Sequence, residues 1–430
     1  MSKSLEVGDN IEVEIGPIAH GGHFIARHNG QVVFVRHAIT DEKVIVEITS
    51  VSSKLARGDA IKILKPSPDR IKESCEYAVP GGCGGCDFQH IKISAQRELK
   101  RIVIKDQFSH IGKVEVNPEI INVEPKNGLN WRTRFDFAVS NNGRAGLYSP
   151  RTKNVVEIDH CMIATKVIND SGIFERKWKG KDRIRVSSSS ADEKNISRAG
   201  RNISGPPLLH ETVGDYLYEI SPESFWQGHK NAPTTLINTA LDLMDLNIGD
   251  KVCDLYGGVG LFTMGISEII GENGYVYLVE SDDYATKDAR KIFKNHKNVL
   301  VRKGRVEKEL PLVDSVDVIL LDPPRNGAGS LVVDQMVSKK PRTIVYVSCD
   351  PASLARDTKL LLENNYSLDK IIAIDLFPMT HHIECVAKFK QTKNLSKKSG
   401  YVFLYPFLKE QVKMRLSICQ KKNSVIWKSM

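Results

Sequence analysis

The 430-residue sequence lacks the two features that would place a chain in a membrane or carry it across one. No apolar stretch approaches the roughly 20 residues that a membrane-spanning helix requires, and the longest one near the end, residues 401–408, is interrupted by Pro406. Residues 1–9 include Lys3, Glu6 and Asp9 and contain no apolar core of a signal peptide. We therefore expect a cytoplasmic protein.

The sequence also lacks a strong charge of one sign over most of its length. The formal net charge is +9, but residues 394–430 supply most of the excess, with eight basic side chains against the single acid Glu410. Charge alone is therefore weak evidence for a polyanionic partner. We expect the basic tail at 394–430 to be a poorly ordered appendage. The alternative is an extension that grips nucleic acid.

A disulfide framework is not expected, because the eight cysteines belong to a chain with cytoplasmic features. Cys75, Cys83 and Cys86 stand close together in a glycine-rich stretch, and Cys161 follows far along the chain. Four thiolates are the ligand set of an iron–sulfur cluster or of a structural zinc ion. The alternative is four unrelated cysteines.

Residues 1–65 carry short alternating apolar segments with turn residues between them. Residues 11–15 alternate strictly, and Asn29 with Gly30 is a strong signal for a two-residue hairpin turn. About five strands in so short a region predict a small β-barrel of the OB type. Such barrels often bind single-stranded nucleic acid, although a purely structural barrel is the alternative.

Residues 66–222 are irregular and are expected to form a central α+β domain that holds the cysteines. Residues 94–108 predict a helix whose basic side chains lie on a solvated face and which can pack on the following domain. Residues 131–139 predict a strand in which aromatic and basic side chains alternate, so that Arg132 and Arg134 can contact nucleic acid or simply lie on a wet face. The polar stretch from Ser187 to Asn202 predicts a loop.

Residues 223–393 alternate between strand and helix patterns, which predicts a doubly wound, mostly parallel sheet of seven strands, an α/β fold. The last two strands are joined by a link from Phe377 to His382 that is too short for a crossover, so they should pair antiparallel. The strands are expected at residues 252–256, 276–279, 299–301, 316–321, 344–347, 371–376 and 383–389.

A glycine loop follows the first of these strands. It runs from Asp254 to Gly260, and Glu280 ends the next strand at the distance from which a carboxylate can bind ribose hydroxyls. Thr263 stands where a pyrophosphate-binding loop would have its third glycine. This pattern favours S-adenosylmethionine, a nucleoside without a pyrophosphate, over NAD.

Three further candidate residues follow later strands of the same sheet. Asp322 begins the sequence DPPR after the fourth strand, Cys349 follows the fifth, and Glu384 lies in the last hairpin. Because ligands bind outside the carboxyl ends of parallel strands, Cys349 is in a position suited to a nucleophile. The alternative for Cys349 alone is a small buried core residue. The three side chains together at one edge favour a catalytic cysteine.

These motifs resemble those of the cluster-containing RNA uracil-C5 methyltransferases, which have a class I methyltransferase domain and an N-terminal TRAM barrel. The resemblance covers about residues 5–390, and its motifs are the segment from Cys75 to His90, SFWQ ending at Gln227, DLYGGVG from Asp254, DPPR from Asp322, SCDP around Cys349, and FPMTHHIE ending at Glu384. It implies a 4Fe–4S cluster on Cys75, Cys83, Cys86 and Cys161, contacts to S-adenosylmethionine from Gln227, Tyr256, Glu280 and Asp322, Cys349 as nucleophile and Glu384 as base.

The resemblance also implies a reaction and a partner. The expected reaction is addition of Cys349 to uracil C6, methyl transfer to C5, and removal of the C5 proton by Glu384. The expected partner is an RNA, with 23S ribosomal RNA favoured and transfer RNA second, and the protein is expected to act as a monomer. The alternatives are a cytosine-C5 methyltransferase and an RNA-binding iron–sulfur protein without activity.

Overall fold

The computed structural model describes residues 5–392, which fold around four β-sheets. Within these residues no helix is long and apolar enough to cross a membrane. The predicted basic tail at 394–430 lies outside the described residues.

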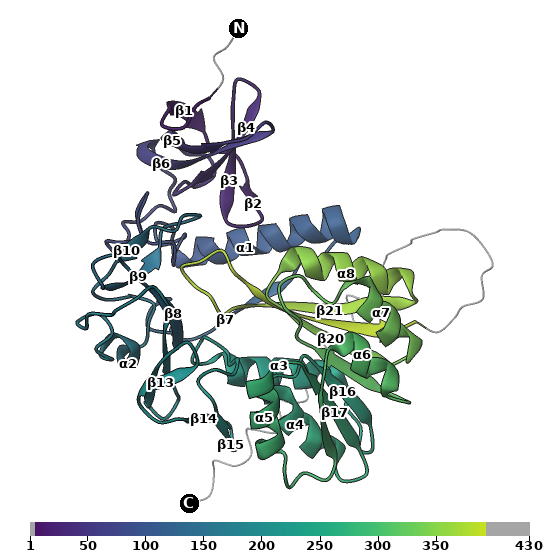
Figure 1. Cartoon of the computed structure of the whole chain (residues 1–430). Helices are drawn as coiled ribbons and strands as arrows, with labels where there is room; N and C mark the ends of the chain where they lie inside the picture. The colour runs from purple at the N-terminus through teal and green to yellow at the C-terminus, as the bar shows by residue number, and fades with distance from the viewer. Residues whose placement is uncertain (1–4, 393–430) are drawn as a thin grey trace, which may run out of the picture. The chain divides into compact units, whose positions relative to one another are not determined.

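The N-terminal segment forms a six-stranded barrel sheet with the order β1-β5-β6-β4-β3-β2 (Figure 1). Its strands are β1 (Asn10–Glu14), β2 (Ile18–Ala19), β3 (His23–His28), β4 (Gln31–Arg36), β5 (Lys43–Val51) and β6 (Leu55–Lys65). The predicted hairpin is confirmed: Asn29 and Gly30 have φ angles of 48° and 83°, as a type I′ turn requires. The short β2 is one strand more than the sequence predicted.

The central region contains a second six-stranded sheet and a separate hairpin. The sheet has the order β10-β9-β8-β11-β12-β13. Its strands and those of the hairpin are β8 (Arg134–Val139), β9 (Ala145–Tyr148), β10 (Val155–Glu157), β11 (Ile184–Ser188), β12 (Lys194–Arg198), β13 (Arg201–Ser204), β14 (Leu209–Val213) and β15 (Tyr216–Ile220).

The predicted loop from Ser187 to Asn202 is wrong, because most of this stretch belongs to β11, β12 and β13. Several of its polar side chains are tolerated inside the sheet because they have hydrogen-bond partners, although the buried Ser187 hydroxyl has none among residues 5–392. The Ser197 hydroxyl donates to Glu223 Oε1 at 2.6 Å, and the Ser188 and Thr165 hydroxyls lie 3.0 Å apart. Composition alone therefore gave the wrong structure here.

The catalytic-domain sheet has eight strands in the order β18-β17-β16-β19-β20-β22-β21-β7. The strands are β7 (Glu119–Asn122), β16 (Lys251–Leu255), β17 (Tyr275–Glu280), β18 (Val299–Lys303), β19 (Val318–Leu321), β20 (Thr343–Ser348), β21 (Tyr366–Asp375) and β22 (Glu384–Gln391). All seven predicted strands are present, and β22 pairs antiparallel with β21 as predicted; it is also antiparallel to β20. The unpredicted β7 is a short, half-exposed edge strand, parallel to β21.

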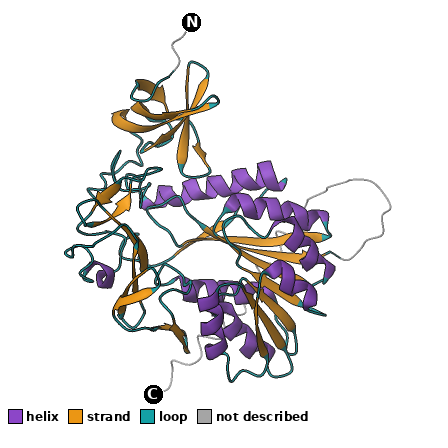
Figure 2. Ribbon diagram, viewed as in Figure 1, coloured by secondary structure: helices purple, strands orange, loops and turns teal. Residues whose placement is uncertain are grey.

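Helices cover both faces of this sheet (Figure 2). One face packs against α3 (Ala232–Met244), α4 (Leu261–Ile270) and α5 (Asp283–Ile292). The other packs against α1 (Ile93–Gln107), its π-helical extension (Phe108–Gly112), α6 (Val306–Glu309), the 3₁₀ turn Leu310–Leu312, α7 (Gly329–Ser338) and α8 (Pro351–Glu363), whereas α2 (Lys166–Asn169) belongs to the central region. Burial on both faces explains why the parallel strands are continuously apolar.

Helix α1, predicted at 94–108, lies beside α8 (Figure 1). The prediction that its basic side chains face solvent is wrong for Lys100, which is 1% exposed. Lys100 Nζ donates to Asp375 Oδ1 at 2.6 Å and to the Phe377 carbonyl at 3.0 Å, and Arg97 Nε lies 3.1 Å from the other carboxylate oxygen of Asp375. These contacts tie α1 to the end of β21.

Candidate active site

Cys349 and Glu384 lie across from each other at one edge of the eight-stranded sheet. In the antiparallel pairing of β20 with β22, Ser348 is opposite Cys385. One residue further toward the edge, the two strands present Cys349 and Glu384. The sequence expectation that these two residues come together is met by the strand register itself.

The turn after Cys349 is fixed by a helix cap. The Asp350 side chain accepts a hydrogen bond of 2.8 Å from the Ser353 amide at the start of α8. Pro351 occupies the first helical position, where its missing N–H is not needed. Cys349 is therefore held, half-buried, between a buried strand and a capped helix.

A pocket of about 140 Å³ opens at Cys349. Four parts of the chain line it: β2 with the barrel turn after it, Phe88 from the segment after Cys86, helix α1, and the edge of the eight-stranded sheet. The polar and charged lining residues are His20, Lys100, Arg325, Cys349, Asp350, His381 and His382. The barrel approaches so closely that a Cβ on Gly22, which has φ +76°, would lie 2.6 Å from the Cβ of His381. Only glycine fits at that position.

Glu384 is a buried carboxyl with a free oxygen. It is 4% exposed, and its Oε1 has no hydrogen-bond partner among residues 5–392. Burial raises its pKa well above the usual range, the charge of Asp322 raises it further, and Arg325 opposes the rise. A carboxylate in this environment is a stronger base than an ordinary glutamate.

The Cys349 thiol responds to the same groups. Burial raises its pKa to about 12, and the charges of Glu384 and Asp322 add to this effect. The Arg325 guanidinium acts in the opposite direction. Arg325 is therefore the cationic side chain beside Cys349 that favours the thiolate, the reactive form of cysteine.

Asp254 and Asp322 form an acidic pair at the ends of adjacent strands β16 and β19. The Asp322 amide donates to the Leu255 carbonyl at 3.2 Å. Burial raises the pKa of both carboxyls to about 7, and for Asp322 the second cause is the charge of Asp254. The Thr263 hydroxyl donates to Asp254 Oδ2 at 2.6 Å. Thr263, which stands where a pyrophosphate-binding loop would have its third glycine, thus hydrogen-bonds the Asp254 carboxyl.

The glycine loop is held in shape by Glu280. Glu280 Oε2 accepts from the Gly258 amide at 3.0 Å, and Oε1 accepts from the Asp282 amide at 2.7 Å. Tyr256, Gly258 and Gly260 have φ angles of 60°, 56° and 93°. The carboxylate therefore has a fixed orientation at the end of β17, and its role toward a ribose stays a prediction.

Gln227 lies apart from these strand ends in the sequence, in the link between β15 and α3. It is 9% exposed, and its carbonyl accepts from the Thr133 hydroxyl at 3.5 Å. The adjacent Trp226 ring packs at 5.3 Å from the ring of Tyr218. Gln227, Tyr256, Glu280 and Asp322 do not line the Cys349 pocket, and neither does Glu384. Asp322 nevertheless lies close enough for its charge to raise the pKa of Cys349 and Glu384.

The four predicted metal-binding cysteines line one hollow. Cys75, Cys86 and Cys161 are buried, and the Gly85 amide donates to Cys83 Sγ at 3.3 Å. Burial raises the pKa of all four thiols, and the cysteines raise one another's pKa, to about 11 for Cys83. Four thiolates can share this space only with a compensating cation, so the donor set fits a bound metal or cluster.

Arg132 supplies one positive charge beside these cysteines, and it lowers the pKa of Cys83 and Cys161. Its guanidinium stacks over the Phe135 ring at 4.4 Å. Arg134 donates to the Pro222 carbonyl. The sequence left two alternatives for these arginines: contact with nucleic acid, or a position on a solvated sheet face. Neither describes them fully, because both guanidinium groups contact other groups of the central region.

Sequence analysis did not assign a role to His20, Lys100 or His382, all of which line the pocket. His382 stands in the quoted FPMTHHIE motif, so a signal for it was available. Lys100 resembles any basic residue of an amphipathic helix, and His20 belongs to a different domain. No pattern in the sequence distinguishes these two residues.

The fold and site together define a class I S-adenosylmethionine-dependent methyltransferase. Four features are typical of that class. They are the order of the strands, the antiparallel β22 between β20 and β21, the glycine loop after β16, and the acidic residue that ends β17.

Comparisons with known proteins identify the family. A TRAM domain model matches residues 4–61, and a tRNA (Uracil-5-)-methyltransferase model matches residues 302–392. An uncharacterized RNA methyltransferase of Streptomyces coelicolor is 38% identical over 426 residues, covering 89% of this chain and 93% of the relative. One of Caldanaerobacter subterraneus is 29% identical, covering 89% and 98%. The chain belongs to this family of TRAM-containing RNA methyltransferases.

A solved structure supports the fold. The crystal structure of Pyrococcus abyssi tRNA (uracil-54, C5)-methyltransferase in complex with S-adenosyl-L-homocysteine matches with a TM-score of 0.67. The match covers 88% of this chain and 99% of that one, at 23% sequence identity. At this identity the likeness establishes the architecture.

Proposed function

We propose that this enzyme methylates C5 of a uridine in RNA, using S-adenosylmethionine as the methyl donor. The observation that carries the proposal is the opposition of Cys349 and Glu384 at the paired ends of β20 and β22, beside a pocket that also contains Arg325. A nucleophile next to a base of raised pKa is the arrangement that this reaction requires.

The chemistry follows from the weakness of uracil C5 as a nucleophile. Cys349 Sγ forms a bond to C6, which places electron density of an enolate on C5. C5 then takes the methyl group from the sulfonium, leaving S-adenosylhomocysteine. Glu384 removes the proton from C5, and the C6–S bond breaks to release 5-methyluridine and the Cys349 thiolate.

Arg325 and Glu384 have separate roles in this cycle: Arg325 stabilises the cysteine thiolate, and Glu384 accepts the C5 proton. The guanidinium of Arg325 favours the thiolate that attacks C6 and the thiolate that leaves at the end. Burial makes the ionised form of Glu384 a strong base for the C5 proton. The positive sulfonium of the methyl donor acts in the same direction as Arg325, since it favours both anions.

We assign the donor to the glycine loop and its neighbours. Glu280 is oriented by the Gly258 amide and can accept ribose hydroxyls, and Tyr256 lies in the same loop. The resemblance to the family adds Asp322 and Gln227 to the residues that would contact the donor. The raised pKa of Asp322 is an energetic cost of burial that a cationic donor would relieve.

We propose that Cys75, Cys83, Cys86 and Cys161 bind a 4Fe–4S cluster. When bound, the cluster would cross-link the loop around Cys83 to the distant Cys161, a structural role, because no electron transfer occurs in the methylation. Arg132 and the Gly85 amide would balance part of its negative charge. Iron and sulfide analysis with an absorption spectrum of anaerobically purified protein tests this assignment against zinc.

For the target, we propose a uridine of 23S ribosomal RNA, because cluster-bearing members of the family favour it. The second candidate is a uridine of transfer RNA, which the description of the matching family model names, and uridine 54 is the position named for the Pyrococcus abyssi enzyme. A target base must leave its stack to reach the pocket, which costs a few kcal/mol and favours loops over duplex. Mapping of 5-methyluridine in ribosomal and transfer RNA from a deletion strain distinguishes the two.

One experiment tests the proposed chemistry. RNA containing 5-fluorouridine should trap the wild-type enzyme covalently, because fluorine at C5 cannot be removed as a proton. Cys349→Ala should neither trap nor methylate, whereas Glu384→Gln should trap and should also accumulate adduct with ordinary RNA. Normal turnover by Cys349→Ala would refute the proposal, and mass spectrometry that finds 5-methylcytidine would replace uridine by cytidine.

A further inference from the structure

The link between β21 and β22 contains a strained residue close to the base. Met379 has a φ of +65°, a left-handed conformation that costs a residue with a side chain free energy. It stands five positions before Glu384, and the link also carries His381 and His382 into the Cys349 pocket. Such a conformation persists only where surrounding contacts determine it.

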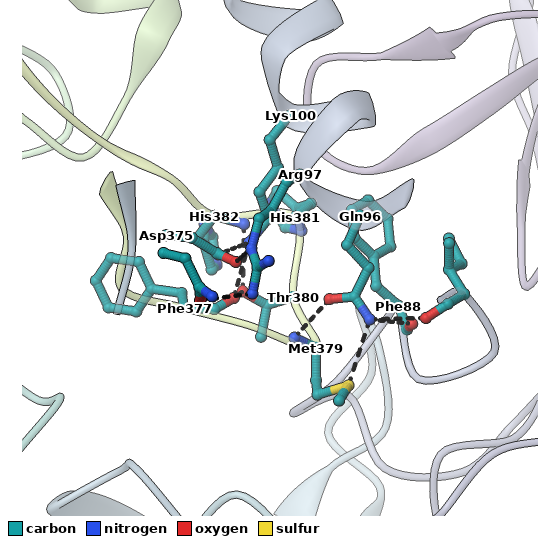
Figure 3. Close-up of polar contacts among 12 residues, drawn as sticks. Phe88, Gln96, Arg97, Lys100, Asp375, Phe377, Met379, Thr380, His381 and His382 are labelled. Atoms are coloured by element: carbon teal, nitrogen blue, oxygen red, sulfur yellow. Dashed lines mark hydrogen bonds and ion pairs between the residues drawn. The ribbon is translucent and has the colours of Figure 1, made fainter. Parts of the chain in front are cut away.

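Every polar group of Met379 is bound by the segment that follows Cys86 (Figure 3). The Met379 amide donates to Gln96 Oε1 at 2.9 Å, and its sulfur accepts from Gln96 Nε2 at 3.4 Å. The Met379 carbonyl accepts from the amides of Asp87 at 3.1 Å and Phe88 at 3.0 Å. The turn is therefore gripped from one side by residues 87–96.

Gln96 makes most of the side-chain contacts that hold the Met379 turn. Its side chain is fully buried, and Nε2 also donates to the carbonyls of Phe88 at 3.0 Å and Ile91 at 2.9 Å. One amide thus joins α1, the segment after Cys86 and the Met379 turn. Only an amide can donate to those carbonyls and accept from Met379 N–H at the same time.

The next residues of the turn are fixed by Asp87. Its carboxylate accepts from the His381 amide at 2.9 Å and lies 2.5 Å from His381 Nδ1. The His381 and His382 rings are 4.0 Å apart, and His382 Nε2 is 3.5 Å from Arg325 Nη2. Arg325 in turn acts on both Cys349 and Glu384.

We propose that Gln96 and Asp87 are positioning residues that set the Met379–His382 turn and thereby the placement of Glu384 for proton removal. The inference rests on the proposed function. It assigns a use to the cysteine-bearing loop: Asp87 directly follows Cys86, so order in that loop is transmitted through the Asp87 and Gln96 contacts to the strand that begins with the base. Cys349 is anchored separately by β20 and the α8 cap, so we expect its addition step to depend less on this turn than proton removal does.

The test separates the two steps. Gln96→Leu and Asp87→Asn, assayed in the full chain, should form the 5-fluorouridine adduct at a rate within about twofold of wild type. Both should lose about 100-fold in kcat on ordinary RNA, the loss expected for misplacement of a catalytic group by about 1 Å. KM for S-adenosylmethionine should be unchanged, and covalent adduct should accumulate with ordinary RNA.

Gln107→Leu is the matched control, because Gln107 lies at the end of the same helix and, within residues 5–392, its side chain bonds only to the exposed Asp106 carboxylate. It should behave as wild type. The inference is overturned if trapping and turnover fall together in both variants, or if both keep kcat within about twofold. Glu384→Gln is assayed in parallel: if it fails to accumulate adduct, the proposed function fails rather than the positioning role.

Discussion

His20 Nε2 lies 3.0 Å from Asp350 Oδ2, so a histidine of the N-terminal barrel contacts the residue that directly follows Cys349. Both side chains are partly exposed, at 38% and 23%. The barrel therefore forms one wall of the catalytic pocket. RNA that enters the pocket must pass a surface that is shared by the barrel and the catalytic domain.

The His20–Asp350 contact predicts a pH-dependent stability. The hydrogen bond that the His20 imidazole donates to the Asp350 carboxylate raises the pKa of His20 in the folded protein. A group with a raised folded pKa stabilises the protein fully below its unfolded pKa of about 6.5. That stabilisation is lost as the pH rises through the folded pKa. His20→Gln should therefore lower the Tm more at pH 6 than at pH 9, as measured by calorimetry.

The control for this measurement is His110→Gln, since His110 is 75% exposed and lies at the end of α1 beside Asp106. Its effect on Tm should be small at both pH values. An equal loss of Tm at pH 6 and pH 9 in His20→Gln would show that the pair contributes packing without charge.

Arg325 should control the ionisation of the nucleophile. Its charge lowers the pKa of Cys349, so Arg325→Gln should move the rise of the trapping rate with pH to higher pH. At pH 7 we expect about tenfold slower trapping by 5-fluorouridine RNA, the effect of one pKa unit. Arg325→Lys, which keeps the charge, should lie between the two. A profile that does not move would remove Arg325 from this role.

Cysteine replacement should affect metal and stability together. Cys161→Ser should lose iron and the cluster absorption, and it should lower the Tm because the Cys83 loop is no longer linked to the distant ligand. Cys253→Ala is the control, since Cys253 is fully buried in β16 and does not line the cysteine hollow. If Cys161→Ser keeps wild-type iron content, Cys161 is not a ligand.

Breaking the buried Lys100–Asp375 ion pair should lower the free energy of unfolding strongly. Lys100→Met leaves the Asp375 carboxylate with Arg97 only and leaves the Phe377 carbonyl without its donor from α1. We expect a loss of about 3 kcal/mol in the free energy of unfolding by urea. The double variant Lys100→Met with Asp375→Asn should lose less, because the buried carboxylate is gone and Arg97 keeps its hydrogen bond to Asn122 Oδ1. Equal losses in both would show that packing dominates.

Much of the fold was predictable because its signals are local. Most of the catalytic strands are apolar runs, as expected for strands buried on both faces, and all seven were found, although β21 begins at Tyr366, before its predicted start at residue 371. The placement of Cys349 and Glu384 at one edge followed from strand direction and the short final link. The Ser187–Asn202 stretch was missed because its polar composition resembles that of a loop, and some of the partners that hold it in strands lie elsewhere in the chain, such as Glu223 for Ser197.

Other parts of the site depend on contacts between residues far apart in the chain. Lys100 meets Asp375, Gln96 meets Met379, and His20 meets Asp350, at separations of 275, 283 and 330 residues. Helical periodicity placed Lys100 on a polar face, and it could not report that an acid from β21 would lie against it. Edge strand β7 was equally invisible, because four half-exposed residues carry too weak a pattern.

The sequence by itself determined the layered sheet, the barrel and the glycine loop, and it singled out the proposed nucleophile and base, because each is written in neighbouring residues through hydrophobic period, turn chemistry and motif. Only the tertiary structure decided that the barrel closes the pocket, that a buried lysine holds α1 to β21, and that Gln96 and Asp87 grip the turn before Glu384. Those contacts depend on how separate elements pack, and burial then fixes the electrostatics of each group that they enclose.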